Sequence, residues 1–237
     1  MKSFKIKNKK IGQNNSVFVI AEIGINHSGD FKKCKKMIKA AAKSGADSVK
    51  IQTIDVDESY MPNTKSYREF KNKNFSNQEL IKLKKYSESL NIIFFSTPGD
   101  IKSLMRLIKI KVPAIKISSG LATNLPLIGR AIKSKMPVII STGLSLKEDL
   151  KDLKKFITKY KNKKVAILKC TSQYPASEDS LDLSAINYLK KQFRLPVGFS
   201  DHSIGDLAAV IAVSNGAAII EKHFTLNKSQ KGADHKI

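Results

Sequence analysis

The sequence has little of the residues that mark several specialised classes of protein. Two cysteines, Cys34 and Cys170, are too few for a disulfide framework or a metal cluster. No apolar run reaches the roughly 18 to 20 residues that a membrane span needs, and residues 1–10 lack the apolar segment of a secretory signal. The 41% hydrophobic and 27% charged residues among 237 argue against disorder. We therefore expect a globular, cytoplasmic protein with no membrane partner.

Arginine is also scarce, and this decides how the high net charge is interpreted. The formal charge of +23 and the sequence pI of about 9.9 would suit a nucleic-acid-binding protein. However, only four of the 43 basic residues are arginine, the residue that best makes bidentate contacts with phosphate and guanine. The lysines are spread over the whole chain. We interpret the charge as a solvated surface and expect no nucleic-acid partner.

Short runs of apolar, often β-branched residues recur along the whole chain. They lie at residues 17–22, 47–52, 92–96, 114–117, 138–141, 165–170, 196–200 and 217–221. Their nearly continuous hydrophobicity is typical of strands that are covered on both faces. The segments between them have helical spacing: residues 30–44 carry one apolar stripe, and Ser76 with Glu79 and Ser145 with Glu148 have capping-box spacing. Residues 55–75 are interpreted as one long loop.

Alternating strands and helices predict right-handed parallel βαβ units. Eight such units in this length favour a closed (β/α)8 TIM barrel over a doubly wound sheet, and no G-x-G-x-x-G motif follows the first strand. We expect residues 1–16 to be an N-terminal extension, a short hairpin under the barrel, and residues 17–237 to form the barrel domain. Only residues 227–237 remain after the eighth strand, so we expect the barrel to lack its last helix.

Polar and ionisable residues end every one of these apolar strands. In a TIM barrel the carboxyl ends of the strands carry the chemistry. Lys50 and Lys116 lie within apolar strands, where an unpaired ammonium would be costly. Together with hydroxyl groups they would hold an anion with several oxygens, a phosphate or a phosphorylated carboxylic acid. The hydroxyl residues are Thr97, Ser119, Ser141 and Ser200. A lysine that forms a Schiff base is the competing interpretation.

Two histidines follow neighbouring strands at the same end of the predicted barrel. His202 and His223 could share one metal ion, with positions left open for water and substrate oxygens. They could equally be hydrogen-bonded histidines without a metal. Asp201 or Glu221 could orient one of the imidazoles. Glu22, at the end of the first strand, is a candidate general base; an ion pair with Lys50 is the alternative.

The motifs resemble, in order, those of the sialic acid synthases, the N-acetylneuraminate synthase family. The first is AEIGINH at residues 21–27. The others are KIQ at 50–52, STP at 96–98, KISSG at 116–120, STG at 141–143, CTSQYP at 170–175, GFSDH at 198–202 and EKHFTL at 221–226. GADHK at 232–236 resembles the family's G-P-D-H-K element with the proline replaced. The resemblance spans residues 17–237, and as an ordered series it is specific.

The resemblance implies a metal-dependent condensation of phosphoenolpyruvate with an N-acetylmannosamine-type amino sugar, which yields a nonulosonic 2-keto acid and phosphate. It assigns the substrate contacts by position. Lys50, Thr97, Lys116, Ser119, Ser141 and Ser200 would hold phosphoenolpyruvate, and Gln52, Tyr174 and Asp234 the sugar. His202 and His223 would bind manganese or magnesium, and Glu22 would activate water. In this assignment the metal stabilises negative charge that grows on the sugar aldehyde oxygen.

Three departures from the family pattern bear on activity. Leu121 replaces a glutamate of the family's sugar site, which predicts lost or redirected activity. Ser172, a further substrate-binding candidate, stands where the family often has asparagine. The C-terminal antifreeze-like domain, through which full-length members complete the partner's site in a homodimer, is absent from this sequence. The alternatives are therefore a synthase for pseudaminic or legionaminic acid, or an impaired barrel that only binds phosphoenolpyruvate.

Overall fold

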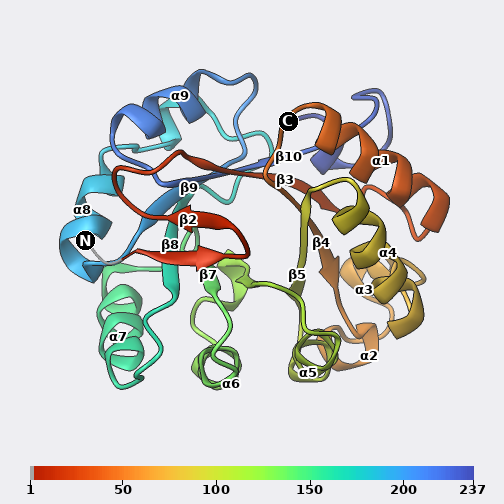
Figure 1. Cartoon of the computed structure of the whole chain (residues 1–237), viewed down its shortest axis with the longest axis horizontal. Helices are drawn as coiled ribbons and strands as arrows, with labels where there is room; N and C mark the ends of the chain where they lie inside the picture. Colours follow the sequence, from red (N-terminus) through yellow and green to blue (C-terminus); the bar gives the residue numbers. More distant parts are fainter. Residues whose placement is uncertain (1–2) are drawn as a thin grey trace.

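The computed structural model describes residues 3–237, and its centre is a closed barrel of parallel strands (Figure 1). The strands are β3 (Phe18–Gly24), β4 (Ser48–Thr53), β5 (Ile93–Pro98), β6 (Ile115–Ile117), β7 (Val138–Ser141), β8 (Val165–Cys170), β9 (Val197–Asp201) and β10 (Ile219–His223). They follow chain order around the barrel, and β10 closes it by pairing with both β9 and β3. The predicted TIM barrel and all eight of its strands are confirmed.

Helices surround the barrel after each of the first seven strands. They are α1 (Phe31–Lys43), α4 (Asn77–Ser89), α5 (Ile101–Ile110), α6 (Leu125–Lys133), α7 (Lys147–Thr158), α8 (Ala185–Phe193) and α9 (Leu207–Ser214). After β10, the residues that the structure describes contain only the short 3₁₀ turn η3 (Ala233–His235), so the predicted lack of a last helix is confirmed for them. No helix within residues 3–237 combines the length and apolar character needed to cross a membrane.

Local sequence signals explain where the helices begin and which face they bury. The α1 stripe of Cys34, Met37, Ile38 and Ala41 is buried against the barrel. Ser76 and Glu79 form the predicted capping box of α4. The box predicted at Ser145 and Glu148 is wrong by one position, because the backbone N–H of Leu146 donates to the carboxylate of Asp149 at 2.7 Å, and α7 begins after Leu146.

The long loop predicted at residues 55–75 contains two short helices, α2 (Val56–Ser59) and α3 (Lys65–Phe70). Thr64 caps α3 by accepting a hydrogen bond from the backbone of Tyr67. The rings of Tyr60 and Phe70 stack with centroids 5.3 Å apart, which joins the two helices. Neither helix has a buried residue, and this is why no apolar periodicity announced them in the sequence.

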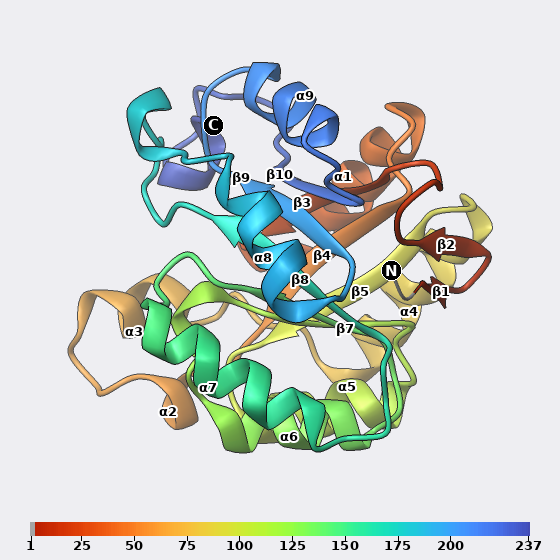
Figure 2. The ribbon, with the colours of Figure 1, turned by 90° about the vertical axis from the view of Figure 1, so that its left-hand side faces the viewer.

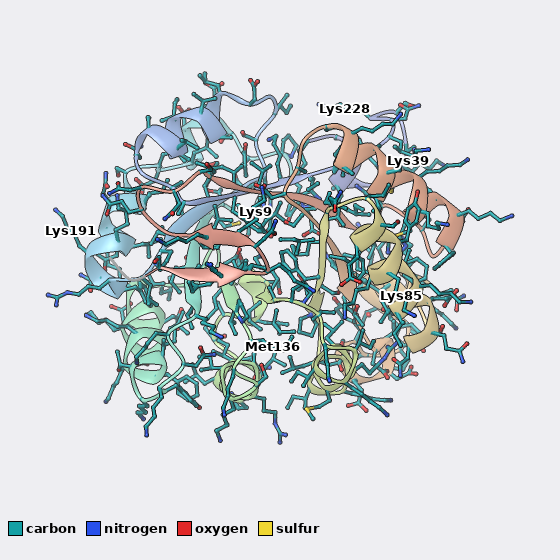
Figure 3. The ribbon with its side chains drawn as sticks, in the orientation of Figure 1. Lys9, Lys39, Lys85, Met136, Lys191 and Lys228 are labelled. Atoms are coloured by element: carbon teal, nitrogen blue, oxygen red, sulfur yellow. The ribbon has the colours of Figure 1, made fainter. Side chains whose placement is uncertain are left out.

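The two ends of the barrel differ in what covers them. Strands β1 (Phe4–Ile6) and β2 (Lys9–Ile11) form an antiparallel hairpin at the amino ends of the barrel strands, and α2 and α3 lie at the opposite end (Figure 2). Ile6 and Ile11 are fully buried beneath the hairpin. The labelled lysines on the outer helices and the final loop point away from the barrel (Figure 3), as the solvated-surface interpretation expects.

Candidate active site

A pocket of about 350 Å³ opens at the carboxyl ends of the barrel strands. Each of the eight strands, or the loop that follows it, contributes residues to the wall of this pocket. The lining residues are Glu22, Lys50, Gln52, Thr97, Lys116, Ser118, Ser119, Gly120, Ser141, Leu144, Cys170, Ser172, Tyr174, Ser200, His202, Glu221 and His223. Every site residue predicted from the sequence therefore lines one pocket, with the exception of Asp234. The Asp234 carboxylate lies just beside it, 3.5 Å from Nδ1 of His223.

Four charged side chains form a buried network at the bottom of this pocket. The ammonium of Lys50 contacts the carboxylate of Glu22 and donates to Oγ1 of Thr97 at 2.9 Å. The ammonium of Lys116 donates to Oε1 of Glu221 at 3.0 Å, and Lys50 lies 3.7 Å from the other oxygen of that carboxylate. All four charged groups are buried. Two cations and two carboxylates thus compensate one another where little of their surface is exposed to water.

Burial and pairing shift the protonation of this network. Burial lowers the pKa of Lys50 to about 7, against the attraction of Glu221, which raises it. Burial alone would raise the pKa of Glu221, but Lys116, Lys50 and a hydrogen bond from Ser200 bring it down to about 2. Glu221 is therefore a firm carboxylate at neutral pH, whereas Lys50 gains or loses its proton near neutrality.

The hydroxyl groups of the pocket differ in whether they already have partners. Oγ of Ser200 donates to Glu221 at 2.8 Å, and Oγ of Ser119 accepts from the backbone N–H of Gly143 at 3.0 Å. Oγ of Ser141 is buried without a hydrogen-bond partner. A buried hydroxyl without a partner is costly, and an anion in the pocket would satisfy it.

The two histidines lie side by side on the pocket wall, with ring centroids 5.4 Å apart. Nδ1 of His202 donates to the carbonyl oxygen of Thr171 at 2.8 Å, and this fixes the tautomer and leaves Nε2 as an acceptor. The hydroxyl of Tyr174 lies 3.2 Å from that Nε2. Burial lowers the pKa of His202, and it lowers the pKa of His223 further, so both rings are neutral at physiological pH.

These two residues fit a divalent cation. Metal-bound imidazoles are neutral, and Nδ1 of His223 is buried without a hydrogen-bond partner. Within residues 3–237, no group of three or more His, Cys, Asp or Glu side chains is arranged to hold a metal ion. A cation here would therefore take two protein ligands and complete its shell with water or substrate oxygens, the open arrangement of a catalytic site.

The expectation that Asp201 or Glu221 orients an imidazole is wrong. Asp201 accepts hydrogen bonds from Lys222 and from Ser203, so it does not orient an imidazole. Glu221 is occupied by Lys116 and Ser200, as described above. The ring of His202 is oriented instead by a backbone carbonyl. For Glu22, the ion pair with Lys50 that was the alternative to a free base is present.

Leu121 does not line the pocket. It ends the 3₁₀ turn η1 (Ser119–Leu121) and packs, partly buried, against the hydrophobic core. The position at which the resemblance implies a glutamate therefore contributes no polar group to this pocket, and Leu121 packs against apolar neighbours there.

Five pocket residues were absent from the predicted site: Ser118, Gly120, Leu144, Cys170 and Glu221. A signal existed for Glu221, because it lies two positions before His223 on one strand and so faces the same side. Burial raises the pKa of the Cys170 thiol, which is thus protonated at neutral pH. Nothing in the sequence distinguishes Leu144, an exposed residue of a loop, from other surface leucines.

Comparison with known proteins shows the family to which the chain belongs. The model of the NeuB family matches residues 37–237. The chain belongs to the NeuB family. A protein of Methanocaldococcus jannaschii without a characterised function is 40% identical over the whole of this chain and 70% of its own length. The N,N'-diacetyllegionaminic acid synthase of Legionella pneumophila is 38% identical over 96% of this chain and 69% of its own length. The relatives of this chain that have functional names are synthases, and the chain is an enzyme of the NeuB family.

Solved structures of family members have the same barrel. The N-acetylneuraminic acid synthetase of Leptospira borgpetersenii, solved in complex with citrate, superposes with a TM-score of 0.95 at 37% identity, covering 100% of this chain and 82% of that one. The spore coat polysaccharide biosynthesis protein SpsE of Bacillus subtilis gives 0.90 at 35%, covering 99% and 67%. A truncated 3-deoxy-D-arabino-heptulosonate 7-phosphate synthase of Thermotoga maritima, at 16% identity and 0.75, shares the fold alone.

Proposed function

We propose that this NeuB-family enzyme condenses phosphoenolpyruvate with an N-acylated amino sugar to give a nonulosonic 2-keto acid and inorganic phosphate. One observation carries the proposal: a single pocket unites two buried lysines, four hydroxyl residues, a pair of neutral imidazoles and Glu22. The names of the relatives support it, since they include synthases of N,N'-diacetyllegionaminic acid, pseudaminic acid and N-acetylneuraminate-9-phosphate.

Phosphoenolpyruvate is proposed to lie between Lys50 and Lys116. Its carboxylate and phosphate oxygens can accept hydrogen bonds from both ammoniums and from the hydroxyl groups, including the Ser141 hydroxyl that has no partner. Thr97, Ser119 and Ser200 complete this set. The incoming anion competes with Glu22 for Lys50, so its arrival releases the Glu22 carboxylate from its ion pair.

The sugar is proposed to lie above this anion, against Gln52, Ser172 and Tyr174, with Asp234 beside His223. His202 and His223 would hold manganese or magnesium, which when bound supplies Lewis acidity toward a carbonyl oxygen. The Thr171 carbonyl keeps Nε2 of His202 unprotonated and ready to act as a ligand. The residues proposed for the sugar and those proposed for phosphoenolpyruvate line the same pocket, so the sugar aldehyde would lie close to the enol carbon of phosphoenolpyruvate.

The proposed reaction forms one carbon–carbon bond, between C3 of phosphoenolpyruvate and the sugar aldehyde carbon. Glu22, once released, takes a proton from a water molecule that attacks C2. Phosphate then leaves by cleavage of its C–O bond, and Lys50 and Lys116 hold the departing oxygens. Lys50, Lys116 and Glu22 are buried at the bottom of the pocket, so few water molecules would share that space with C2.

The direct test is release of phosphate from phosphoenolpyruvate in the presence of Mn²⁺ and N-acetylmannosamine, with diacetamido-hexoses assayed in parallel. Turnover with the first sugar supports a sialic acid synthase, and turnover only with the second supports a legionaminic or pseudaminic acid synthase. Binding of phosphoenolpyruvate without turnover for any sugar would leave an impaired barrel and refute the proposal. The Leu121→Glu variant then tests whether that position is the cause.

The percentage identities do not distinguish between these acceptor sugars, because named relatives of three kinds are between 33% and 38% identical to the chain. The direction of Leu121 into the core favours a binding mode in which this position does not touch the sugar. We also propose a cytoplasmic location, which suits the two free, buried cysteines.

A further inference from the structure

Glu22 uses only one of its two carboxylate oxygens in the buried charge network. Oε2 contacts the ammonium of Lys50, whereas Oε1 is buried and has no hydrogen-bond partner among residues 3–237. A buried carboxylate oxygen without a partner is costly, and a group that donates a hydrogen bond to it would remove that cost. Oε1 of Glu22 therefore marks a place where the site needs a hydrogen-bond donor.

Gly24, the last residue of strand β3, leaves the space in front of this oxygen open. A side-chain carbon at this position would lie 3.2 Å from Oε1 of Glu22, 3.2 Å from Oδ2 of Asp234 and 3.7 Å from Nε2 of Gln52. Three polar atoms from three separate segments therefore converge in front of one buried α-carbon. Because glycine has no Cβ, a small ligand atom can approach the backbone between them.

The backbone of the AEIGINH motif produces this convergence. The pairing of β3 with β4 shifts register between Glu22 and Gly24, so β3 carries one extra residue there, and Gly24 has a φ of +56°. The side-chain amide of Asn26 donates to the carbonyl oxygens of Phe224 at 3.1 Å and of Asp234 at 3.4 Å. These two bonds tie the C-terminal segment to the loop after β3. The motif that supplies Glu22 thus also positions Asp234.

We propose that Glu22 and Asp234 hold one water molecule between them, in front of Gly24, and that this water attacks C2 of phosphoenolpyruvate. The attack rests on the function proposed above, whereas the water site rests on the geometry alone. The two hydrogens of the water donate to Oε1 of Glu22 and to Oδ2 of Asp234, and one lone pair accepts from Nε2 of Gln52. The second lone pair is left free for the reaction.

The proton transfer in this step goes to Glu22 alone. Oε1 of Glu22 takes one proton of the water as the water oxygen forms its bond to C2. The other proton stays on that oxygen and continues to donate to Asp234, which orients the water and keeps its own charge. Two carboxylates with room for one water between them are an arrangement that other enzymes use to activate it. Gly24 and Asn26 act through these groups and are positioning residues.

Crystallography tests the water site without any need for turnover. Crystals of the wild-type chain with phosphoenolpyruvate should show one ordered water within about 3.2 Å of both Oε1 of Glu22 and Oδ2 of Asp234. Crystals of the Gly24→Ala variant should lack it, because the added methyl group blocks its approach. A wild-type structure without this water, a variant structure that keeps it, or a sugar hydroxyl in its place would each overturn the proposal.

Kinetics tests the role of the water, with Gly45→Ala as the matched control. Both glycines have positive φ, +56° at Gly24 and +82° at Gly45, so alanine strains the backbone at either position. No described atom lies within 4 Å of a side-chain carbon placed at Gly45. Gly24→Ala should lower kcat for phosphate release about 100-fold and change the KM for phosphoenolpyruvate less than about threefold. Gly45→Ala should keep kcat within about twofold of the wild type. Equal kcat values in the two variants would overturn the proposal.

Failure of this inference is distinguishable from failure of the proposed function. A wild-type chain that releases no phosphate with any sugar refutes the proposed function, and the crystal structures then decide the water site by themselves. If Gly24→Ala does not fold, Asp234→Asn provides the second variant. It keeps the shape of the side chain but is a weaker acceptor, so kcat should fall about tenfold at an unchanged KM for phosphoenolpyruvate. An unchanged kcat in that variant would also overturn the proposal.

Discussion

The ammonium of Lys116 lies 3.0 Å from Oε1 of Glu221, and both side chains are buried inside the barrel. A buried ion pair does not have to stabilise a protein, but removal of one partner leaves an uncompensated charge away from water. Substitution of either residue of this pair is therefore expected to lower the stability of the protein.

Glu221→Gln should reduce the free energy of unfolding by about 3 kcal/mol, because Lys116 loses its counter-charge in a buried position. Urea unfolding measures this directly. Glu88→Gln is the matched control: its pair with Lys7 is about half exposed on both sides, and its loss should cost less than about 1 kcal/mol. Equal effects at the two positions would contradict the role of burial.

Binding of phosphoenolpyruvate should weaken as pH rises above 7. Lys50, with a pKa of about 7, is protonated below that pH and loses its charge above it, so the affinity should fall by up to about tenfold per pH unit. Calorimetric titration between pH 6 and 8.5 measures the slope. Lys50→Arg keeps its charge over this range and should flatten the profile. A wild-type affinity independent of pH would remove Lys50 from the anion contact.

The protein should lose stability in mild acid through His27. This ring is fully buried, packs at a tilt against Phe75 with centroids 4.5 Å apart and accepts a hydrogen bond from the backbone of Gly29. Burial lowers the pKa of His27 to about 4, whereas the unfolded value is 6.5. The unfolded state therefore binds the proton first, and stability falls as pH drops below about 6.5, by about 2 kcal/mol at pH 5.

Urea unfolding at pH 7.5 and pH 5 gives this difference. His27→Asn retains an acceptor for Gly29 but does not titrate, so it should show a smaller loss between the two pH values even if it is less stable at both. An identical loss in the variant and the wild type would place the acid sensitivity on other histidines.

Mn²⁺ should stabilise the protein through His202 and His223. A ligand present at about 100 times its dissociation constant adds about 2.7 kcal/mol to folding, which raises the Tm by roughly 5 to 10 °C for a chain of this size. Differential scanning fluorimetry with Mn²⁺ and with EDTA measures the shift. His202→Ala and His223→Ala should abolish it, whereas His27→Asn, outside the pocket, should retain it. A shift that survives both alanine variants would locate the cation elsewhere.

Much of the architecture could be predicted because each barrel strand is buried on both faces and its sequence is nearly all apolar. The carboxyl ends then had to meet at one mouth, which brought Lys50, Thr97 and His202 together although they are far apart in sequence. Helices α2 and α3 could not be predicted, since they bury no side chain and their order comes from a cap and a pair of stacked rings.

Which charged side chains of the pocket contact one another was harder to predict than which residues lie in the pocket. Lys116 was predicted at the site and Glu221 was not, and which carboxylate meets which ammonium depends on the shear of the barrel. For the same reason, the sequence left the contact between Glu22 and Lys50 as one of two options. The direction of Leu121 depends on a 3₁₀ turn that no motif announces.

The four buried charges of the pocket have a further consequence for how ligands enter. Lys50, Lys116, Glu22 and Glu221 sum to zero charge when Lys50 is protonated, and to one negative charge when it is not. A substrate with both a carboxylate and a phosphate would upset that neutrality, so a compensating positive charge has to arrive with it. A divalent ion on the imidazoles is one available carrier. Because the pKa of Lys50 is about 7, a proton taken up by the molecules in which Lys50 is neutral before binding is the other, and titrations in buffers of different ionisation enthalpy, with and without Mn²⁺, tell them apart.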